Sequence, residues 1–522
     1  MSTLRRVTAR TAFLVVLAAP APLLARAQTS TYQLLQTFSD LLNQIRVKYV
    51  DSVTTEHLVR GAIEGMLASL DPHSYYLTHD RAARIQAWNE GRLGATGILV
   101  ETVEGAITVA AVLAGSPAER AHVSPGDRIV AVNDTTVAGL GPQEVQSLLV
   151  GVRGSRVRLR LERGPRLEPD TVSVTVRNDN VVIRSVTRAR TLADGIGYVR
   201  LGEFRANAGR ELREAIERVA AGPDPRRIIL DLRGNPGGLL SSAMDVLSMF
   251  LSKGQMAFRT IGRHPDANAA YPIVRDGPYH DARLVVLIDE NSASASEAVA
   301  GSLQDHDRAV LVGRRSFGKA LVQVPFLVQP AADEVMLTIA YVETPSGRII
   351  QRRYRGLSVA QYETFAGKGG APTDTEAVYK TDRGRFVRGG GGIMPDSLLP
   401  APAGIPLWSL AAADSGFDDA VSDSVAQAMP QDSAARAAWV ESPGLWSARL
   451  LPPLLQRVQT RLGVTARTDP AQQARIARAM AARVAEERWG EAAAEELLVY
   501  SDPDIAAAVA VLSRPPVPVG GP

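Results

Sequence analysis

The chain has 522 residues, a length that corresponds to about two to four domains, and 45% of them are hydrophobic, which is enough for several packed cores. Cysteine is absent, so disulfides, a cysteine nucleophile and thiolate metal sites are excluded, and the seven histidines show no ligand spacing. The formal charge of +3 would suit an anionic partner, but part of it lies at the N-terminus.

Residues 1–27 have the features of a secretory signal peptide. Three arginines lie within the first ten residues, an apolar run covers residues 12–24, and Ala25-Arg26-Ala27 matches a cleavage site. The run is shorter than the roughly 20 residues of a membrane span, which argues against the alternative of an uncleaved anchor. Cleavage would remove four of the 58 Lys and Arg residues and leave 54 against 55 Asp and Glu residues, a net charge of −1. We therefore expect an exported protein of the periplasm or cell envelope, with no nucleic-acid partner.

Residues 28–90 are predicted to be an N-terminal helical segment. Helical spacing predicts one apolar face, made by Leu34, Leu35, Phe38, Leu41, Leu42 and Ile45. A second helix is expected from about residue 56 to residue 70. Such a face serves as core or as a dimer surface and carries no chemistry. His73 is expected to be a structural hydrogen-bonding residue rather than a metal ligand.

Residues 91–165 change to short predicted strands, at 107–112, 128–132 and 156–162. The pattern SPAERAHVSPGDRIVAVND within this segment resembles a PDZ domain. PDZ domains bind a peptide C-terminus by adding it as a strand, with its carboxylate in a nest of backbone N–H groups. The resemblance implies that the carboxylate-binding loop is formed by Gly94, Ala95, Thr96, Gly97, Ile98 and Leu99. The alternative is a small β-module that acts only as a spacer.

Residues 195–345 alternate strands with helices, which predicts an α/β layer with mainly parallel strands. The expected strands are 196–201, 227–232, 284–289, 309–313, 321–326 and 335–341, and the expected helices 208–221 and 239–250. Sites in such layers form at the carboxyl ends of the strands. Residues 401–522 are rich in Ala, Arg and Glu and are predicted to be a helical extension, with a disordered tail PPVPVGGP.

Three serines, Ser292, Ser294 and Ser296, precede one of the predicted helices. Ser294 and Glu297 fit a capping box, which is the simplest explanation of the pattern. A nucleophilic serine would need a base, because a free hydroxyl is weak. His306 is nearest in sequence, but twelve helical residues place it about 18 Å away. A lysine that is neutral at working pH is the remaining option, as in Ser–Lys enzymes.

Lys319 is the candidate base, because it follows the strand at 309–313 in a turn expected to lie beside the start of the serine helix. Gln323 would share a face with Lys319 in an extended segment and could orient its amine. The alternative is a solvated lysine in a turn. DLRGNPGG supplies a candidate oxyanion hole from the N–H groups of Gly237 and Gly238, with Ala295 as a further donor. Its alternatives are an ordinary strand-to-helix turn or a phosphate loop, although G-x-G-x-x-G and a P-loop lysine are absent.

Together, DLRGNPGG, SASASEAVAGSLQDHDRAVLVGRRSFGKALVQ, TPSGRIIQ and GGGGIMPD resemble the carboxyl-terminal processing proteases, the tail-specific Ser–Lys peptidases. GMLASLDPHSYYL and the PDZ-like segment occur in the order of that family, so the resemblance covers about residues 35–400. It implies Ser294 as the nucleophile and Lys319, 25 residues later, as the base. It also implies Gln323 as third member, a structural role for Asp305, and a core similar to the crotonase-like α/β superfold.

We therefore expect a signal peptide at 1–27, the helical segment at 28–90, the PDZ domain at 91–165, the Ser–Lys peptidase core at 166–400 and the helical extension at 401–522. The predicted function is a serine endopeptidase that selects protein C-terminal tails and needs no metal or cofactor. The resemblance also implies a homo-oligomer and allows for an adaptor protein. The alternative is a catalytically silent PDZ scaffold, for which Ala320, where the family has glycine, is the sequence reason. A Ser-His-Asp hydrolase is excluded by the lack of G-x-S-x-G.

Overall fold

The structure is a computed structural model that describes most of the chain between residues 30 and 514. The described ranges are 30–89, 94–103, 106–113, 116–138, 140–151, 153–163, 170–180, 184–220, 226–329, 332–357, 362, 377–466 and 469–514. The predicted signal peptide and the predicted disordered tail lie outside them. The chain divides into two compact units, residues 1–66 and residues 67–522.

The first unit contains the two predicted helices, α1 (Thr31–Lys48) and most of α2 (Thr55–Ala68). α1 begins at a capping box in which Ser30 and Gln33 satisfy each other's backbone N–H groups. None of the side chains of α1 is buried within the described chain. α1 and α2 therefore lie close to the two segments that the sequence predicts to be helical.

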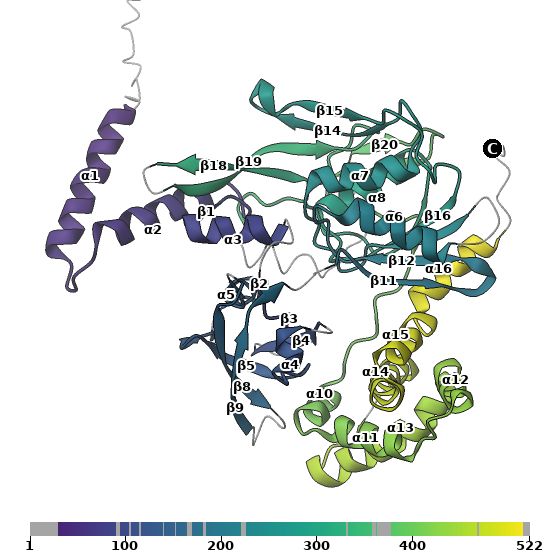
Figure 1. Ribbon diagram of the computed structural model, residues 1–522. Helices are drawn as coiled ribbons and strands as arrows, with labels where there is room; N and C mark the ends of the chain where they lie inside the picture. The colour runs from purple at the N-terminus through teal and green to yellow at the C-terminus, as the bar shows by residue number, and fades with distance from the viewer. Residues whose placement is uncertain are drawn as a thin grey trace, which may run out of the picture. The chain divides into compact units, whose positions relative to one another are not determined.

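The centre of the second unit is a six-stranded sheet with the order β11-β12-β13-β16-β17-β22 (Figure 1). The strands are β11 (Val186–Thr191), β12 (Gly197–Leu201), β13 (Arg227–Asp231), β16 (Arg283–Ile288), β17 (Val310–Gly313) and β22 (Ser397–Leu398). All neighbours pair in parallel except β11 and β12, which pair antiparallel. The predicted parallel α/β layer is thus present, and its strands end at a common edge.

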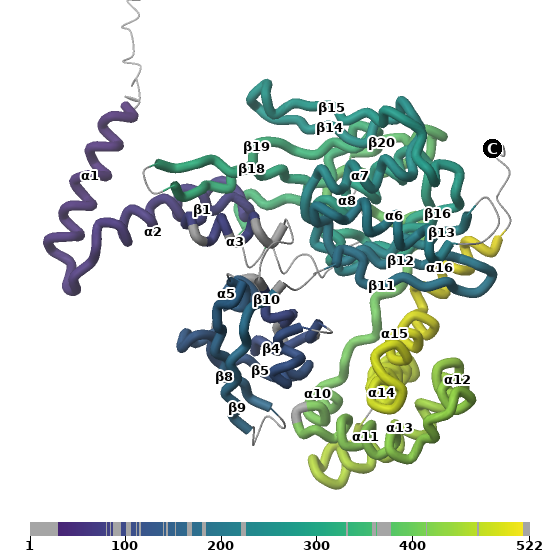
Figure 2. Tube along the Cα trace, in the orientation of Figure 1, coloured from purple at the N-terminus to yellow at the C-terminus, as the bar shows by residue number. Residues whose placement is uncertain are grey.

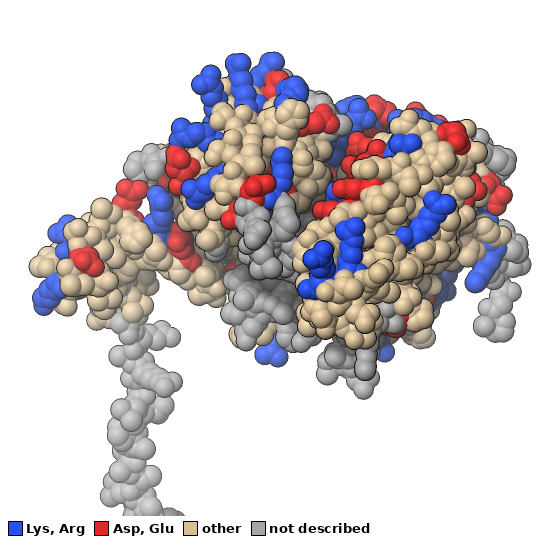
Figure 3. All heavy atoms as spheres, turned by 90° about the horizontal axis from the view of Figure 1, so that it is seen from below, with Lys and Arg blue, Asp and Glu red and all other residues tan. Residues whose placement is uncertain are grey.

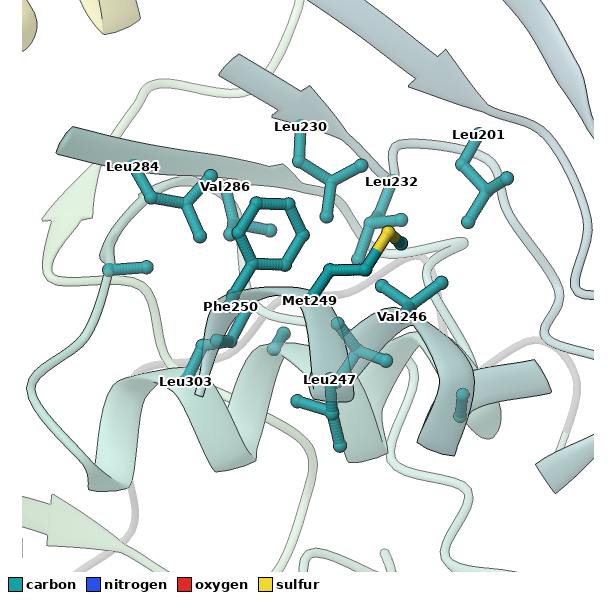
Figure 4. Close-up of a cluster of buried hydrophobic side chains, with 14 of the residues drawn as sticks. Leu201, Leu230, Leu232, Val246, Leu247, Met249, Phe250, Leu284, Val286 and Leu303 are labelled. Atoms are coloured by element: carbon teal, nitrogen blue, oxygen red, sulfur yellow. The ribbon is translucent and has the colours of Figure 1, made fainter. Parts of the chain in front are cut away.

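Helices cover both faces of this sheet. Successive side chains along a strand point to opposite faces, so each face contributes to a core of its own. Leu230, Leu284 and Val286 face a core closed by α6 (Ala208–Val219), α7 (Leu240–Phe250) and α8 (Ala295–Asp305), as Figure 4 shows for α7. The intervening Ile229, Val285 and Leu287 face a second core, closed by α16 (Pro503–Ser513) through Ile505, Ala508 and Leu512. The last described helix therefore belongs to the packing of the central sheet (Figure 2).

A second sheet has the order β1-β19-β14-β15, and β18 also pairs with β19. Its strands are β1 (Tyr75–Leu77), β14 (Met256–Gly262), β15 (Ala269–Pro272), β18 (Leu321–Val328) and β19 (Asp333–Glu343). β1 pairs with β19 across more than 250 residues of sequence. The motif SLDPHSYYL, which ends in β1, therefore lies against β19, and β19 also pairs with β18, the strand that contains Gln323. The helix α3 (His79–Asn89) follows β1, and β20 (Val378–Lys380) forms a separate hairpin with β21 (Phe386–Arg388).

The PDZ-like segment forms a sheet with the order β3-β4-β5-β8-β9, to which β6 is added through β5. The strands are β3 (Ile98–Val103), β4 (Ala106–Val112), β5 (Arg128–Val132), β6 (Thr135–Thr136), β8 (Arg156–Arg163) and β9 (Asp170–Arg177). A small sheet of β2 (Gly94–Ala95), β7 (Val150–Gly151) and β10 (Asp179–Asn180) and the helices α4 (Pro117–Arg120) and α5 (Pro142–Leu148) complete it. Among its described residues fourteen buried apolar side chains form a core of its own.

The C-terminal part is helical and has its own core, built around Trp408, Trp439 and Trp446. Its helices are α10 (Leu407–Asp414), α11 (Phe417–Ala428), α12 (Ser433–Glu441), α13 (Pro443–Leu462), α14 (Pro470–Trp489) and α15 (Glu491–Tyr500). Within the described residues, no helix has the length and apolar character of a membrane span. On the face shown in Figure 3, Lys and Arg side chains are interspersed with Asp and Glu side chains.

Candidate active site

The three serines differ in what their side chains do. Ser292 and Ser296 are completely buried, and their hydroxyls donate to the backbone carbonyls of Leu232 (2.8 Å) and Asn235 (2.9 Å). Ser294 is only half-buried and has a φ of 56°, in a region that costs a non-glycine residue about 1–3 kcal/mol. Such strain is typical of functional positions. The geometry therefore assigns structural roles to the two outer serines and leaves Ser294 as the candidate nucleophile.

Glu297 connects Ser294 to Lys319. Its Oε2 accepts the backbone N–H of Ser294 at 2.9 Å, as the capping box predicted, and also the backbone N–H of Lys319 at 2.8 Å. Its Oε1 accepts the Ser316 hydroxyl at 2.5 Å and the Gly318 N–H at 2.6 Å. Two residues that lie 25 positions apart are therefore bound through their backbones to a single carboxylate oxygen.

The environment of Glu297 is unusual for a carboxylate, because its side chain is completely buried. Burial raises its pKa from 4.5 to about 7, and the hydrogen bonds from Ser316 and the three backbone N–H groups act against that rise. All four neighbours donate, so the ionised form is the one that satisfies them. The sequence suggested only the helix-capping bond, since the other three donors come from a distant loop.

The glycine-rich turn after β13 lies directly against Ser294. A Cβ on Gly237 would be 2.8 Å from the Ser294 Cβ and 2.9 Å from the Ala295 nitrogen. The Gly237 N–H donates to Asn235 Oδ1 at 2.9 Å, so it is already engaged. Gly237 therefore allows the backbone of the turn to lie close to Ser294, but its own N–H is not free to donate. Gly238 and Ala295 remain the candidate oxyanion donors.

We expect Gly237→Ala to reduce the rate of peptide hydrolysis at least about 100-fold. The added Cβ would displace Ser294 or the start of α8, and the φ of 103° is itself unfavourable for alanine, by roughly 1–2 kcal/mol. Gly254→Ala is the matched control, because Gly254 also has a positive φ of 89° but no atom within 4 Å of the added Cβ. In a thermal melt Gly254→Ala should lose only the stability that its positive φ costs an alanine and Gly237→Ala at least as much, and only Gly237→Ala should lose activity. Equal activity of both would contradict this role.

Gln323 is held by a network that reaches back to the N-terminal motif. Its Nε2 donates to Thr338 Oγ1 at 3.2 Å, and Thr338 Oγ1 donates to Asp71 Oδ1 at 3.1 Å. Ser74 donates its hydroxyl to Asp71 Oδ2 at 2.7 Å and accepts the Thr338 N–H. Sequence reasoning missed this network. The polar run DPHS just before a strand was the available signal for it.

His73 belongs to the same N-terminal motif as Asp71 and Ser74 and is held by hydrogen bonds of its own. Its backbone N–H donates to Asp71, and its ring meets the Tyr362 hydroxyl at 3.2 Å. Burial, and after it the charge of Lys319, lowers the pKa of His73 to about 3, so the ring is neutral at physiological pH. Arg352 lies between the rings of Phe317 and Tyr362, 3.7 and 3.9 Å from their centres. His73 thus has the structural role that was expected of it.

Asp305 and Ala320, which the sequence also singled out, are both buried and hydrogen-bonded. Asp305 is buried and binds Arg348 at 2.7 Å and the N–H of Ser346 at 3.0 Å, which fixes the TPSGR turn and agrees with its expected role. Ala320 is buried, donates its N–H to Gln351 at 2.8 Å, and does not have a positive φ. The position therefore does not require glycine.

Known protein families match the N-terminal part, the PDZ-like segment and the α/β core of the chain separately. The sequence model of peptidase family S41 matches residues 195–359, a PDZ-domain model matches residues 108–163, and a model named for the N-terminal domain of the activating protease CtpB matches residues 21–81. A carboxy-terminal-processing protease of Bartonella bacilliformis is 33% identical over 329 residues, which cover 62% of this chain and 74% of that protein. The chain belongs to the carboxy-terminal processing proteases.

A second relative and a solved structure are also similar to parts of this chain. A carboxyl-terminal-processing protease of a Picosynechococcus species is 35% identical over 291 residues, covering 54% of this protease and 68% of the relative. Among solved structures, a photosystem II D1 C-terminal processing protease is 24% identical and covers 71% of this chain and 93% of its own, with a TM-score of 0.41. This protein is therefore a serine-type peptidase with a PDZ domain.

The predicted carboxylate-binding loop of the protease spans β2 and the start of β3. Thr96 is buried, and its carbonyl accepts the N–H of Ala118 at 2.8 Å. Among the described strands, β3 pairs with β4 along one edge. On its other edge, Gln146 of α5 donates to the Ile98 carbonyl at 2.9 Å and accepts the Val100 N–H at 3.3 Å. A side chain therefore occupies the strand edge to which a peptide would add.

Proposed function

We propose that this protease is an exported endopeptidase that selects protein C-terminal tails with its PDZ domain and cleaves by a Ser294–Lys319 acyl-enzyme mechanism. The observation that carries the proposal is the shared hydrogen bonding of the Ser294 and Lys319 backbones to one Glu297 oxygen. The buried hydroxyls of Ser292 and Ser296 support the choice among the serines.

In this mechanism the neutral Lys319 amine takes the proton of the Ser294 hydroxyl as Ser294 attacks the scissile carbonyl. The N–H groups of Gly238 and Ala295 stabilise the oxyanion of the tetrahedral intermediate. Lys319 then gives the proton to the leaving amine. Water attacks the acyl-enzyme with Lys319 as base and releases the new C-terminus and Ser294. Gln323, held by Thr338, orients the Lys319 amine.

The remaining assignments are proposals on the same footing. We assign the core to the crotonase-like superfold, supported by its alternating strands and helices. We divide the protein at the residues given by the sequence, and we expect export to the periplasm or cell envelope and a homo-oligomer; the family resemblance also allows for an adaptor protein. The alternative of a catalytically silent scaffold rested on Ala320 in place of a glycine. That argument no longer applies, because the backbone conformation at Ala320 is open to alanine.

The test is a gel assay with the mature chain, residues 28–522, and an unfolded substrate protein with an apolar C-terminal tail. We expect cleavage at least about tenfold faster than that of the same substrate with an amidated C-terminus, which lacks the terminal carboxylate. Equal rates would rule out tail recognition by the PDZ domain. Binding of the tail without cleavage at any substrate concentration would favour the scaffold.

A further inference from the structure

The N-terminal end of α16 meets two arginines that follow β13 and β17, the two strands on either side of β16 in the central sheet. Asp504 Oδ2 accepts from Arg233 at 2.9 Å and from Arg314 at 2.6 Å. Asp502 Oδ1 accepts from Arg233 at 3.1 Å. Arg233 also forms a two-bond pair with Asp231, at 3.0 and 2.7 Å. One carboxylate of the C-terminal helix therefore joins the ends of β13 and β17.

This cluster is too deeply buried to be an ordinary surface ion pair. Asp231 is completely buried, and Arg233 and Asp504 are each 8% exposed. Burial alone would raise the pKa of Asp502, but the charge of Arg233 outweighs it and the pKa is lowered. The pKa of Arg233 is raised against its own burial by the bonds to Asp231 and the charge of Asp502. Because a buried charge without its partner is strongly unfavourable, the arginines and aspartates form an interdependent set.

Both arginines begin loops that end at the reactive groups. Four residues after Arg233, Gly237 contacts Ser294, and the carbonyl of Asn235 between them accepts from the Ala293 N–H and the Ser296 hydroxyl. Five residues after Arg314 comes Lys319, and the Phe317 N–H on the way donates to the Ser292 carbonyl at 3.0 Å. A movement of either arginine would shift the Gly237 loop relative to the Lys319 loop.

We propose that α16 is a positioning element of the active site, in which Asp504, assisted by Asp502, sets the spacing between the Gly237 loop and the Lys319 loop. α16 lies well beyond residues 195–359, the part matched by the peptidase model. The proposal goes beyond the chemistry given above and rests on Ser294 and Lys319 being the reactive pair. It assigns to α16, the last helix among the described residues, a role in the reaction rate.

The experiment measures how fast Ser294 of the mature chain is labelled by a small fluorophosphonate probe, which forms an Oγ–P bond and releases fluoride. Such a probe needs no tail recognition, so the rate reports the reactive pair alone. We expect Asp504→Asn, which keeps the shape but removes the charge, to slow labelling at least tenfold well below its melting temperature. Asp504→Glu, which keeps the charge, should recover the rate to within about threefold.

Leu512→Ala is the matched control, because Leu512 is a buried core residue of the same helix far from the ion cluster. It should lower the melting temperature at least as much as Asp504→Asn and label within threefold of wild type. Wild-type labelling of Asp504→Asn, or equal slowing of Leu512→Ala, would overturn the proposal and leave α16 a purely stabilising role. Failure of the proposed function would look different, because the wild type itself would then label no faster than Ser294→Ala.

Discussion

Replacement of Ser294 or Lys319 by alanine is expected to reduce peptide hydrolysis by at least about 10⁴-fold, to the background of the assay. A nucleophile without its base, or a base without its nucleophile, loses nearly the whole covalent pathway. For the same reason the double variant should be no slower than either single variant. The measurement is the rate of substrate cleavage followed on a gel, and the wild-type rate should rise with pH with a pKa below the 10.4 of free lysine.

Ser296→Ala and Ser292→Ala are the matched controls. Each removes one buried hydroxyl that donates to a backbone carbonyl, which costs about 1–3 kcal/mol of stability. Both should melt at a lower temperature and still cleave within about tenfold of wild type. An inactive Ser296→Ala beside an active Ser294→Ala would show that the nucleophile is assigned to the wrong serine.

Glu297→Gln is expected to lower kcat by about 10² to 10³. A glutamine has the same shape but offers one acceptor oxygen and an NH₂ group, while all four of its neighbours are donors. The amide can face either way, so two of the four donors would lose their acceptor, at about 1–3 kcal/mol each: either the Ser294 and Lys319 N–H groups, or the Ser316 hydroxyl and the Gly318 N–H. Glu214→Gln serves as control, since Glu214 is exposed and forms a surface ion pair with Arg210 one helical turn away.

The pH dependence gives this prediction a second readout. Folding raises the Glu297 pKa from 4.5 to about 7, so the folded state favours the protonated form. The resulting stabilisation is complete below pH 4.5 and is lost as pH rises through 7, by roughly 3 kcal/mol in all. Activity should change in the opposite direction, because the ionised carboxylate accepts all four bonds. Urea unfolding at pH 5 and pH 8 should show the wild type losing stability relative to Glu297→Gln, and a constant difference would contradict the assignment.

Much of the fold could be predicted because its signals are local. Short apolar segments predicted β5, β13 and β17 to within a residue or two, helical spacing predicted α1, and the alternation of strands with helices predicted α6 and α7. β14 and β15 were missed. β14 mixes apolar residues with Arg259 and Thr260 and takes its place through pairing with β19, which lies about 80 residues later. Pairing over such distances leaves little trace in either segment alone.

The candidate site divides in the same way. Ser294, Lys319 and the glycine turn belong to short motifs, and their predicted roles came from the resemblance of those motifs to the family. The partners that hold them could not, because Asp71, Thr338 and Asp504 come from distant segments and have ordinary neighbours in sequence. The N–H of Gly237 shows a subtler limit, since the motif indicates a free donor and only the fold reveals that Asn235 already accepts it.

The Gln146 side chain on the edge of β3 has a consequence for how tightly substrate tails are held. An arriving tail would add its backbone to an edge whose Ile98 carbonyl and Val100 N–H are already satisfied. Tail binding is then an exchange, in which new hydrogen bonds replace old ones and their net contribution is small. Affinity would come mainly from the terminal carboxylate and the apolar side chains beside it. A tail held in this way is released readily, which suits an enzyme that must let each substrate go after cutting it.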